Sequence, residues 1–270
     1  MTEPATTTKK TVYLIRHAES EENVRMKSFT QVWSSVARFS LPRSTDVRSS
    51  MQLLNVQAQV DSSVSTYGRA QIANVAQQLQ TADFLHTAAV TLVAHSPLMR
   101  AQETSQGLLQ CRASSADDSN NSIIICNPHP DKIRVVSLDI LREKTPAEWL
   151  PGNSASLRKR LDALETWLTQ QDETVICIVG HSQYFKNLLN LSYKFKNCDV
   201  YKVQFDPSVA RAVPTEKDVL PPQWSGLERV FECTVTEDES LAAETENAAT
   251  STAEAAGATN LTPGATQDGK

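Results

Sequence analysis

Residues 174–181, Thr-Val-Ile-Cys-Ile-Val-Gly-His, form a continuous apolar run that ends in glycine and histidine. A run of this kind, without polar alternation, is typical of a central strand that is covered on both faces. Residues 11–17, Thr-Val-Tyr-Leu-Ile-Arg-His, give a second apolar strand that also ends in a histidine. A helix is predicted after each run, so the sequence favours strands that alternate with helices.

The rest of the chain continues this alternation. Short β-rich runs predict strands, and apolar residues that recur at helical spacing predict helices. Strands are predicted at 89–94, 122–126, 133–138, 200–205 and 230–235, and helices at 29–39, 66–79, 97–109, 154–168 and 182–191. The helix at 97–109 would carry Pro97 in its first turn. The pattern predicts an α/β fold, a three-layer α/β/α sandwich with a mostly parallel central sheet.

The charge of the chain is unevenly distributed. The 270 residues are 40% hydrophobic, which is enough for a sizeable core, and carry a net charge of −5. Residues 236–270 hold seven acids and one lysine, a net charge of −6, so residues 1–235 carry +1. The 236–270 tail is rich in Ala, Thr and Glu and is predicted to be disordered, as is a polar arm at 1–10. One folded domain is predicted over 11–235.

The cysteines and the N-terminus predict a reducing compartment, with the cytoplasm as the default. The five cysteines are odd in number and scattered, and they contain no C-x-x-C pair. They indicate neither a disulfide framework nor a zinc site. The first ten residues lack the apolar core of a signal peptide. No apolar run approaches the roughly 20 residues of a membrane helix, so no membrane partner is expected.

Two histidines stand directly after predicted strands, His17 and His181. The carboxyl ends of parallel strands are where α/β sheets bind ligands, so adjacent strands would place both imidazoles over one crevice. Arg16 stands beside the first histidine, and Arg100 follows the strand predicted at 89–94. A lone histidine at a strand end is more often structural than catalytic. Two histidines with two arginines predict a cationic pocket suited to a phosphoryl group.

Five stretches between residues 11 and 205 resemble the histidine phosphatase superfamily, which includes the cofactor-dependent phosphoglycerate mutases and the fructose-2,6-bisphosphatases. In chain order they are Arg16-His17-Ala18-Glu19-Ser20 with Asn23 (R-H-G-E-[ST]-x-x-N), residues 61–71 (D-x-x-L-[ST]-x-x-G-x-x-Q), Ser96-Pro97-Leu98-Met99-Arg100 to Thr104 (S-P-L-x-R-A-x-x-T), Leu141-Arg142-Glu143, and Val179-Gly180-His181-Ser182 (G-H-G). The resemblance implies a phosphoglycerate mutase-like fold and a histidine phosphatase-like catalytic domain over 11–235.

The resemblance also implies catalytic roles. His17 would be the nucleophile that forms a phosphohistidine, which water then hydrolyses. The phosphoryl oxygens would be held by Arg16, Arg100 and His181. No metal or other cofactor is expected, since the guanidinium groups supply the positive charge. The resemblance thus predicts a metal-independent phosphatase of the histidine acid type, a phosphoric monoester hydrolase.

The remaining predicted site residues act on the leaving group and the substrate. Glu143 would protonate the leaving oxygen and then activate water, with Glu148 as the alternative acid. Asn23 is expected to donate to the phosphate, and Ser20 is a weaker candidate for the same role. Two alternatives remain at this point, a phosphoglycerate mutase-type phosphotransferase and a catalytically weak module that recognises phosphate.

Departures from the family pattern bear on the mutase alternative. Ala18 replaces the usual glycine, and Ser182 stands where a glycine is common. The mutases carry an aromatic residue before the asparagine of the first motif, where this chain has Glu22. Their R-x-Y-G element is also missing, since Lys144-Thr145-Pro146 follows the proposed acid. Mutase activity is therefore disfavoured.

Residues 24–60 form a basic insert between the first two motifs. Residues 24–48 hold five basic side chains and one acidic one, a net charge of +4. The insert would be either a cap that selects a multiply phosphorylated substrate or acidic phosphopeptide, or a solvated basic face on a supporting helix. The excess of positive charge is small and no aromatic residues are interleaved with the basic ones, so a nucleic-acid partner is disfavoured. The expected partner is a small phosphorylated metabolite or a phosphoprotein.

Overall fold

The computed structural model describes residues 8–23, 61–110, 123–124, 133–143, 154–212 and 214–236. Within these ranges one sheet has the strand order β3-β4-β2-β5-β1-β6-β7. The strands are β1 (Lys10–Arg16), β2 (Leu92–His95), β3 (Ile123–Ile124), β4 (Ile133–Ser137), β5 (Val175–Gly180), β6 (Val200–Phe205) and β7 (Trp224–Phe231).

The middle of the sheet is parallel. β4, β2, β5 and β1 are parallel neighbours. At the two sides, β6 runs antiparallel to β1, β7 antiparallel to β6, and β3 antiparallel to β4. β5 lies at the centre, as its uninterrupted apolar sequence predicts.

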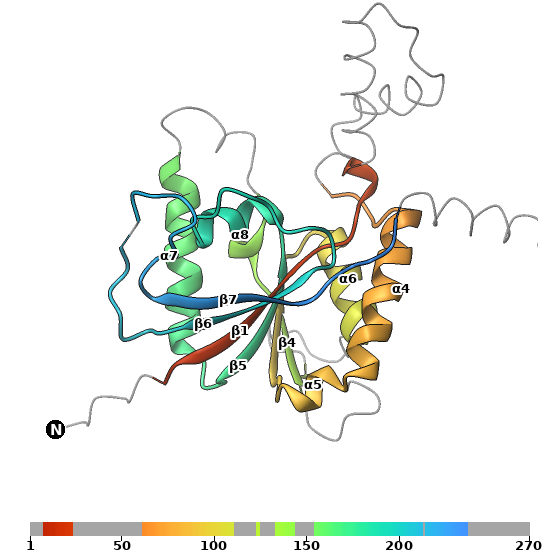
Figure 1. Ribbon diagram of the computed structural model, residues 1–270, viewed down its shortest axis with the longest axis horizontal. Coiled ribbons are helices and arrows are strands. Elements are labelled where there is room, and N and C mark those ends of the chain that lie inside the picture. The colour runs from red at the N-terminus through yellow and green to blue at the C-terminus, as the bar shows by residue number, and fades with distance from the viewer. Residues whose placement is uncertain are drawn as a thin grey trace, which may run out of the picture. The chain divides into compact units, whose positions relative to one another are not determined.

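Helices cover both faces of the sheet (Figure 1). On one side lie α4 (Thr66–Thr81), α5 (Phe84–Thr87) and α6 (Met99–Leu109), and on the other α7 (Ser154–Gln170) and α8 (Ser182–Leu188). A short 3-10 helix, η2 (Asp139–Leu141), follows β4. The predicted three-layer α/β/α sandwich is therefore confirmed.

The side chains of β1 alternate between two apolar cores. Val12 and Leu14 pack into the core beneath α7 and α8, while Tyr13 and Ile15 pack into the core beneath α4 and α6. A strand that contributes to two cores needs apolar residues at every position, which explains its uninterrupted apolar sequence.

Several predicted boundaries differ from the structure. The strand predicted at 230–235 is β7, which begins at Trp224 and ends at Phe231. β7 is a largely exposed edge strand, so its start carries little of the apolar signal that marks a buried strand. α6 begins at Met99 with Leu98 as its extended N-cap, so Pro97 lies before the helix and not in its first turn.

The predicted N-terminal arm ends earlier than residue 10. Lys10 belongs to β1, is 4% exposed, and its Nζ donates to the carbonyl oxygens of Gln171 (2.6 Å) and Glu173 (3.0 Å). The helix predicted at 29–39, the insert at 24–60, residues 237–270 of the tail and the alternative acid Glu148 lie outside the described residues. None of the described helices is long and apolar enough to cross a membrane.

Candidate active site

The carboxyl ends of β1 and β5 bring His17 and His181 together. The parallel register pairs Arg16 with Gly180, so the histidines that follow lie level with each other. The backbone N–H of His17 donates to the Gly180 carbonyl at 2.9 Å. The two ring centroids are 5.0 Å apart at an interplanar angle of 62°. The structure therefore places both imidazoles at one edge of the sheet.

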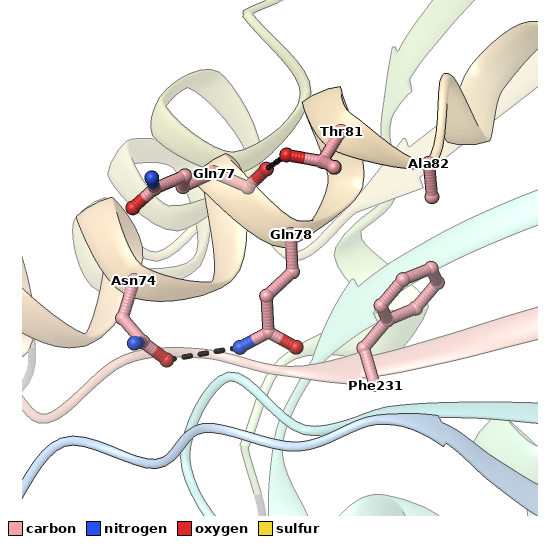
Figure 2. A pocket seen from close by; sticks show the side chains of 6 residues that line it. All are labelled: Asn74, Gln77, Gln78, Thr81, Ala82 and Phe231. Atoms are coloured by element: carbon pink, nitrogen blue, oxygen red, sulfur yellow. Dashed lines mark hydrogen bonds between the residues drawn. The ribbon is translucent and has the colours of Figure 1, made fainter.

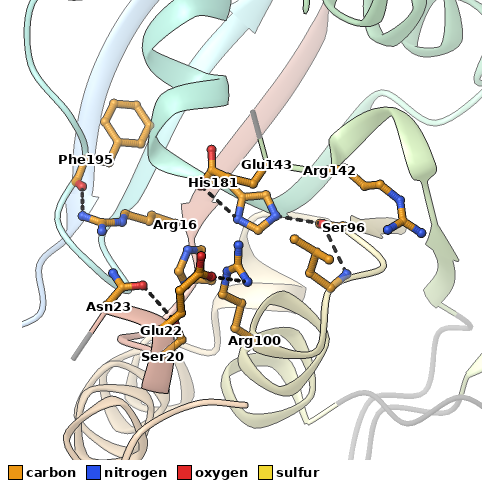
Figure 3. Close-up of polar contacts among 12 residues, drawn as sticks. Arg16, Ser20, Glu22, Asn23, Ser96, Arg100, Arg142, Glu143, His181 and Phe195 are labelled. Carbon is orange, nitrogen blue, oxygen red and sulfur yellow. Dashed lines mark hydrogen bonds and ion pairs between the residues drawn. The ribbon is translucent and has the colours of Figure 1, made fainter. Parts of the chain in front are cut away.

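β2 brings a third strand end to the same edge. It pairs with β5 on the side away from β1, and the Ser96 N–H that follows it donates to the Val179 carbonyl at 3.0 Å. The Ser96 hydroxyl lies 2.8 Å from His181 Nε2. Arg100, in the first turn of α6, lies beside His181 (Figure 3), and its charge also acts on His17.

Arg100 is buried and Arg16 is partly buried, and both guanidinium groups are incompletely hydrogen-bonded. Arg16 donates through Nη1 to the Phe195 carbonyl at 2.7 Å, but its Nε has no hydrogen-bond partner among the described residues. Arg100 is 4% exposed, and its Nε and Nη1 have no hydrogen-bond partner among the described residues either. Burial lowers the pKa of Arg16 from its usual value, and the Glu143 carboxylate is the first effect that opposes this. Unpartnered buried donors are costly, so the pair is suited to an anion.

The surroundings of His17 keep its imidazole neutral and determine which ring nitrogen carries the proton. Its Nδ1 lies 2.6 Å from the Ala18 carbonyl oxygen, which can only accept, so Nδ1 carries the proton and Nε2 keeps its lone pair. Burial lowers the pKa of His17 well below 6.5, and the charges of Arg100 and Arg16 lower it further. The Asn197 side-chain amide donates to the His17 carbonyl at 2.7 Å and fixes the backbone here. This arrangement leaves Nε2 with an available lone pair at neutral pH.

His181 lies between Ser96 and the proposed acid. It is fully buried, and burial, followed by the neighbouring His17, lowers its pKa well below 6.5. Its Nδ1 is 3.4 Å from a carboxylate oxygen of Glu143, without the geometry of a hydrogen bond. The Glu143 side chain is 27% exposed, so one carboxylate faces both the imidazole and solvent.

Arg160 fixes the segment that carries Glu143. It reaches from α7 and donates through Nη1 to the Arg142 carbonyl at 2.6 Å and through Nη2 to the Glu143 carbonyl at 3.5 Å. The same guanidinium lies 5.7 Å from the centre of the Tyr184 ring. The backbone of the acid is thereby tied to a helix whose apolar face is buried in the core.

Ser20 and Asn23 form one unit. The Ser20 hydroxyl donates to Asn23 Oδ1 at 2.7 Å, so it orients the amide and leaves Nδ2 for another acceptor. Ser20 is fully buried, and its backbone bridges to Val64. Figure 3 shows both residues on the side of the site where Glu22 approaches Arg100.

The second motif holds the loop that follows His17. Ser65 caps α4 by accepting from the Gly68 N–H at 3.0 Å, and Gln71 Oε1 accepts from the Glu19 N–H at 2.9 Å. Gly68 lets the backbones approach, because a Cβ there would lie 2.1 Å from the Glu19 carbonyl oxygen. The motif therefore positions the loop after His17.

Four residues that shape the site were not singled out from the sequence. They are Ser96, Arg160, Asn197 and Glu22, the last as the partner of Arg100. The position of Ser96 inside the third motif was an available signal. Arg160 lies on an ordinary amphipathic helix, and Asn197 lies in a polar loop. For these two, no local pattern in the sequence announces the long-range hydrogen bond.

One group of ligand atoms in the site has the composition of a metal centre. The described residues include His17, Glu143 and His181, whose potential ligand atoms all lie within 4.8 Å of one another. Arg16 and Arg100 act on the same imidazoles through their positive charge. A divalent cation placed there would be repelled by both guanidinium groups. The surroundings therefore favour an anion over a metal.

A second hollow, of about 460 Å³, lies between α4 and β7 (Figure 2) and is less suited to an anion than the site at the strand ends. Its lining holds no charged side chain and consists of Asn74, Gln77, Gln78, Thr81, Ala82 and Phe231. Two of its amides are already used, since Gln78 donates to Asn74 at 3.0 Å.

Comparison with known proteins finds similar solved structures. No protein-family model and no curated protein matches the chain. A phosphoserine phosphatase from Entamoeba histolytica is 15% identical, with a TM-score of 0.43 over 84% of this chain and 100% of that chain. A mycobacterial glucosyl-3-phosphoglycerate phosphatase is 16% identical, with a TM-score of 0.41 over 72% of this chain and 92% of that one. A chain described as mycobacterial hydrolase 1 is 13% identical, with a TM-score of 0.43 over 85% and 100%.

Replacing Gly68 with alanine is expected to lower the free energy of unfolding by about 2–3 kcal/mol, because the new Cβ meets a backbone oxygen that cannot move away cheaply. Gly107→Ala is the matched control, since its Cβ would meet only the side chain of Ile72. That variant should stay within about 1 kcal/mol of the wild type. Urea unfolding of both variants measures the difference, and equal costs would contradict the close approach.

The stability of the fold should depend on pH through the two buried imidazoles. The unfolded chain protonates its histidines near pH 6.5, whereas His17 and His181 stay neutral in the fold well below that value. Stability is thus fully present above pH 6.5 and is lost as the pH falls below it. In His181→Asn, the loss between about pH 7.5 and pH 5 should be smaller than in the wild type, because one of the two imidazoles is gone. An unchanged loss in urea unfolding would show that His181 is not held neutral.

Proposed function

We propose that this protein is a phosphatase that hydrolyses a phosphomonoester through a phosphohistidine on His17. The observation that carries the proposal is one sheet edge where two neutral buried imidazoles meet two guanidinium groups that keep buried donors without hydrogen-bond partners. Three of the five motifs that resemble the histidine phosphatase superfamily supply these four residues. Charge-assisted hydrogen bonds from arginine are a strong way to hold phosphoryl oxygens.

In the first half of the reaction, His17 Nε2 attacks phosphorus. The N–P bond forms as the bond between phosphorus and the ester oxygen breaks, and the Glu143 carboxyl group gives its proton to the departing oxygen. Arg16 and Arg100 stabilise the charge on the transferring oxygens. The Phe195 carbonyl holds the Arg16 guanidinium in place, and burial restricts the motion of Arg100.

In the second half, water hydrolyses the phosphohistidine. The Glu143 carboxylate takes a proton from the water, the water oxygen bonds to phosphorus, and the N–P bond breaks to restore His17. His181 stays neutral and donates to a phosphoryl oxygen from one ring nitrogen. Asn23, oriented by Ser20, supplies a further donor through Nδ2.

The proposed substrate is a small phosphorylated metabolite or a phosphoprotein, and no metal takes part. The two guanidinium groups perform the charge stabilisation that magnesium provides in other phosphoryl-transfer enzymes. The mutase alternative receives no support from this site, because Glu22, not an aromatic residue, precedes Asn23.

The nucleophile is tested by phosphate release from p-nitrophenyl phosphate in the presence of a chelator. The wild type should turn over, and His17→Ala should lose at least about 10³-fold in kcat because no covalent intermediate can form. His86→Ala, which removes a histidine that is 65% exposed, is the matched control and should leave kcat unchanged.

Three outcomes would contradict this mechanism. Activity that requires added metal, or that survives in His17→Ala, would exclude the metal-independent phosphohistidine route. Isomerisation of a phosphoglycerate without net phosphate release would favour the mutase. Tight binding of phosphorylated ligands without turnover of any substrate would favour a recognition module.

The proton donor is tested by the dependence on the leaving group. Glu143→Gln should lower kcat/KM for an alkyl phosphate by about 10² or more, because an alkoxide leaves poorly without a proton. The same variant should have much less effect on p-nitrophenyl phosphate, whose leaving group departs as a stable anion. Glu148→Gln is measured in parallel. If it shows this difference and Glu143→Gln does not, Glu148 is the acid.

A further inference from the structure

Glu22 places a carboxylate against one of the two guanidinium groups that the proposed function assigns to phosphate. Its Oε2 lies 3.1 Å from Arg100 Nη1. The side chain of Glu22 is 30% exposed, whereas that of Arg100 is 4% exposed. Figure 3 shows Glu22 reaching from the segment after β1 towards Arg100, which lies beside His181.

The geometry of this pair differs from that of a structural ion pair in the same molecule. Arg134 donates to Glu173 through Nε and Nη2, each at 2.9 Å, which is a two-point hydrogen-bonded contact. Arg100 Nη1, by contrast, makes no hydrogen bond to Glu22 in spite of the short distance. Glu22 therefore neutralises the buried charge without satisfying its donors, and a better-placed anion can replace it.

We propose that Glu22 is an internal anion that competes with the phosphoryl group for Arg100 and so sets the affinity of the site for anions. The proposal rests on the proposed function in so far as the pocket takes phosphate. When phosphate binds, the Glu22 carboxylate leaves Arg100, and its partial exposure gives it access to water without crossing the core.

Competition of this kind has a quantitative signature. When a ligand must displace a resident group, its apparent affinity is its intrinsic affinity multiplied by the fraction of molecules in which the group is absent. This factor is the same for every ligand. Weakly held monoanions then fall below useful affinity, while a strongly held phosphate dianion still binds. Simple repulsion by a Glu22 that stays in place would instead weaken a dianion by about the square of the factor for a monoanion.

The test is isothermal titration calorimetry of inorganic phosphate with the full chain at mildly alkaline pH and constant ionic strength. Nitrate, the monoanion, is measured by competition against phosphate. We expect Glu22→Gln to bind both anions about tenfold more tightly than the wild type. Glu21→Gln is the matched control, since it removes the same charge from the neighbouring residue and should change either affinity by less than about twofold.

A second variant separates the contact from the charge. Glu22→Asp keeps the negative charge but shortens the side chain by one methylene, so its carboxylate reaches Arg100 less well. It should also tighten phosphate binding, by less than Glu22→Gln. Thermal unfolding of each variant confirms that it is folded, and either variant alone suffices for the test.

The remaining outcomes overturn the proposal. Unchanged phosphate affinity in the Glu22 variants, with wild-type binding intact, refutes the competition and leaves the proposed function standing. A gain for phosphate near the square of the gain for nitrate shows repulsion without displacement. If the folded wild type and Glu22→Gln both fail to bind phosphate, the phosphate pocket itself is wrong and both proposals fall.

Discussion

The parallel pairing of β1 with β5 is the constraint on which the site depends. Opposite Arg16 stands Gly180, so the chain leaves both strands at the same level and the next residue on each is a histidine. A slip of one residue in either strand would turn its side chains to the opposite faces and separate the two imidazoles. The slip is opposed by burial, since residues on both faces of β1 pack into the two cores.

Burial and charge act in the same sense on the two imidazoles that this pairing assembles. Both lower the pKa of His17 and of His181, so the rings stay neutral. A guanidinium group keeps its charge in the same surroundings. One environment thus holds neutral imidazoles next to fixed positive charge, and the proposed phosphoryl transfer to nitrogen would require both.

Much of this arrangement could be predicted from the sequence. β1, β5 and β6 carry strong apolar signals, and α4 and α7 show clear helical stripes. Because ligand sites gather at strand ends, His17, His181 and Arg100 could be placed near one another before any coordinates. The weak elements were less predictable. The short helix α5 is a single turn, and the exposed strand β7 lacks a buried face to mark its start.

The contacts of the site were harder to predict than its members. Glu22, Arg160 and Asn197 act through single hydrogen bonds or ion pairs to residues distant in sequence. Such contacts leave no periodic pattern in the sequence. The presence of a polar residue in a loop or on an exposed helix face can be explained equally well by contact with solvent. The pairing of Ser20 with Asn23 shows the same limit, because the motif names both residues but does not reveal that the Ser20 hydroxyl donates to the Asn23 amide oxygen.

The strand order also determines how this domain can acquire its fold during synthesis. Of the described strands, β1 leaves the ribosome first, yet both of its sheet neighbours, β5 and β6, belong to the second half of the chain. This strand must therefore wait, with apolar side chains on both faces, until most of the domain has been translated. Until then, or in a product truncated before β5, the unpaired β1 is exposed as a site for aggregation.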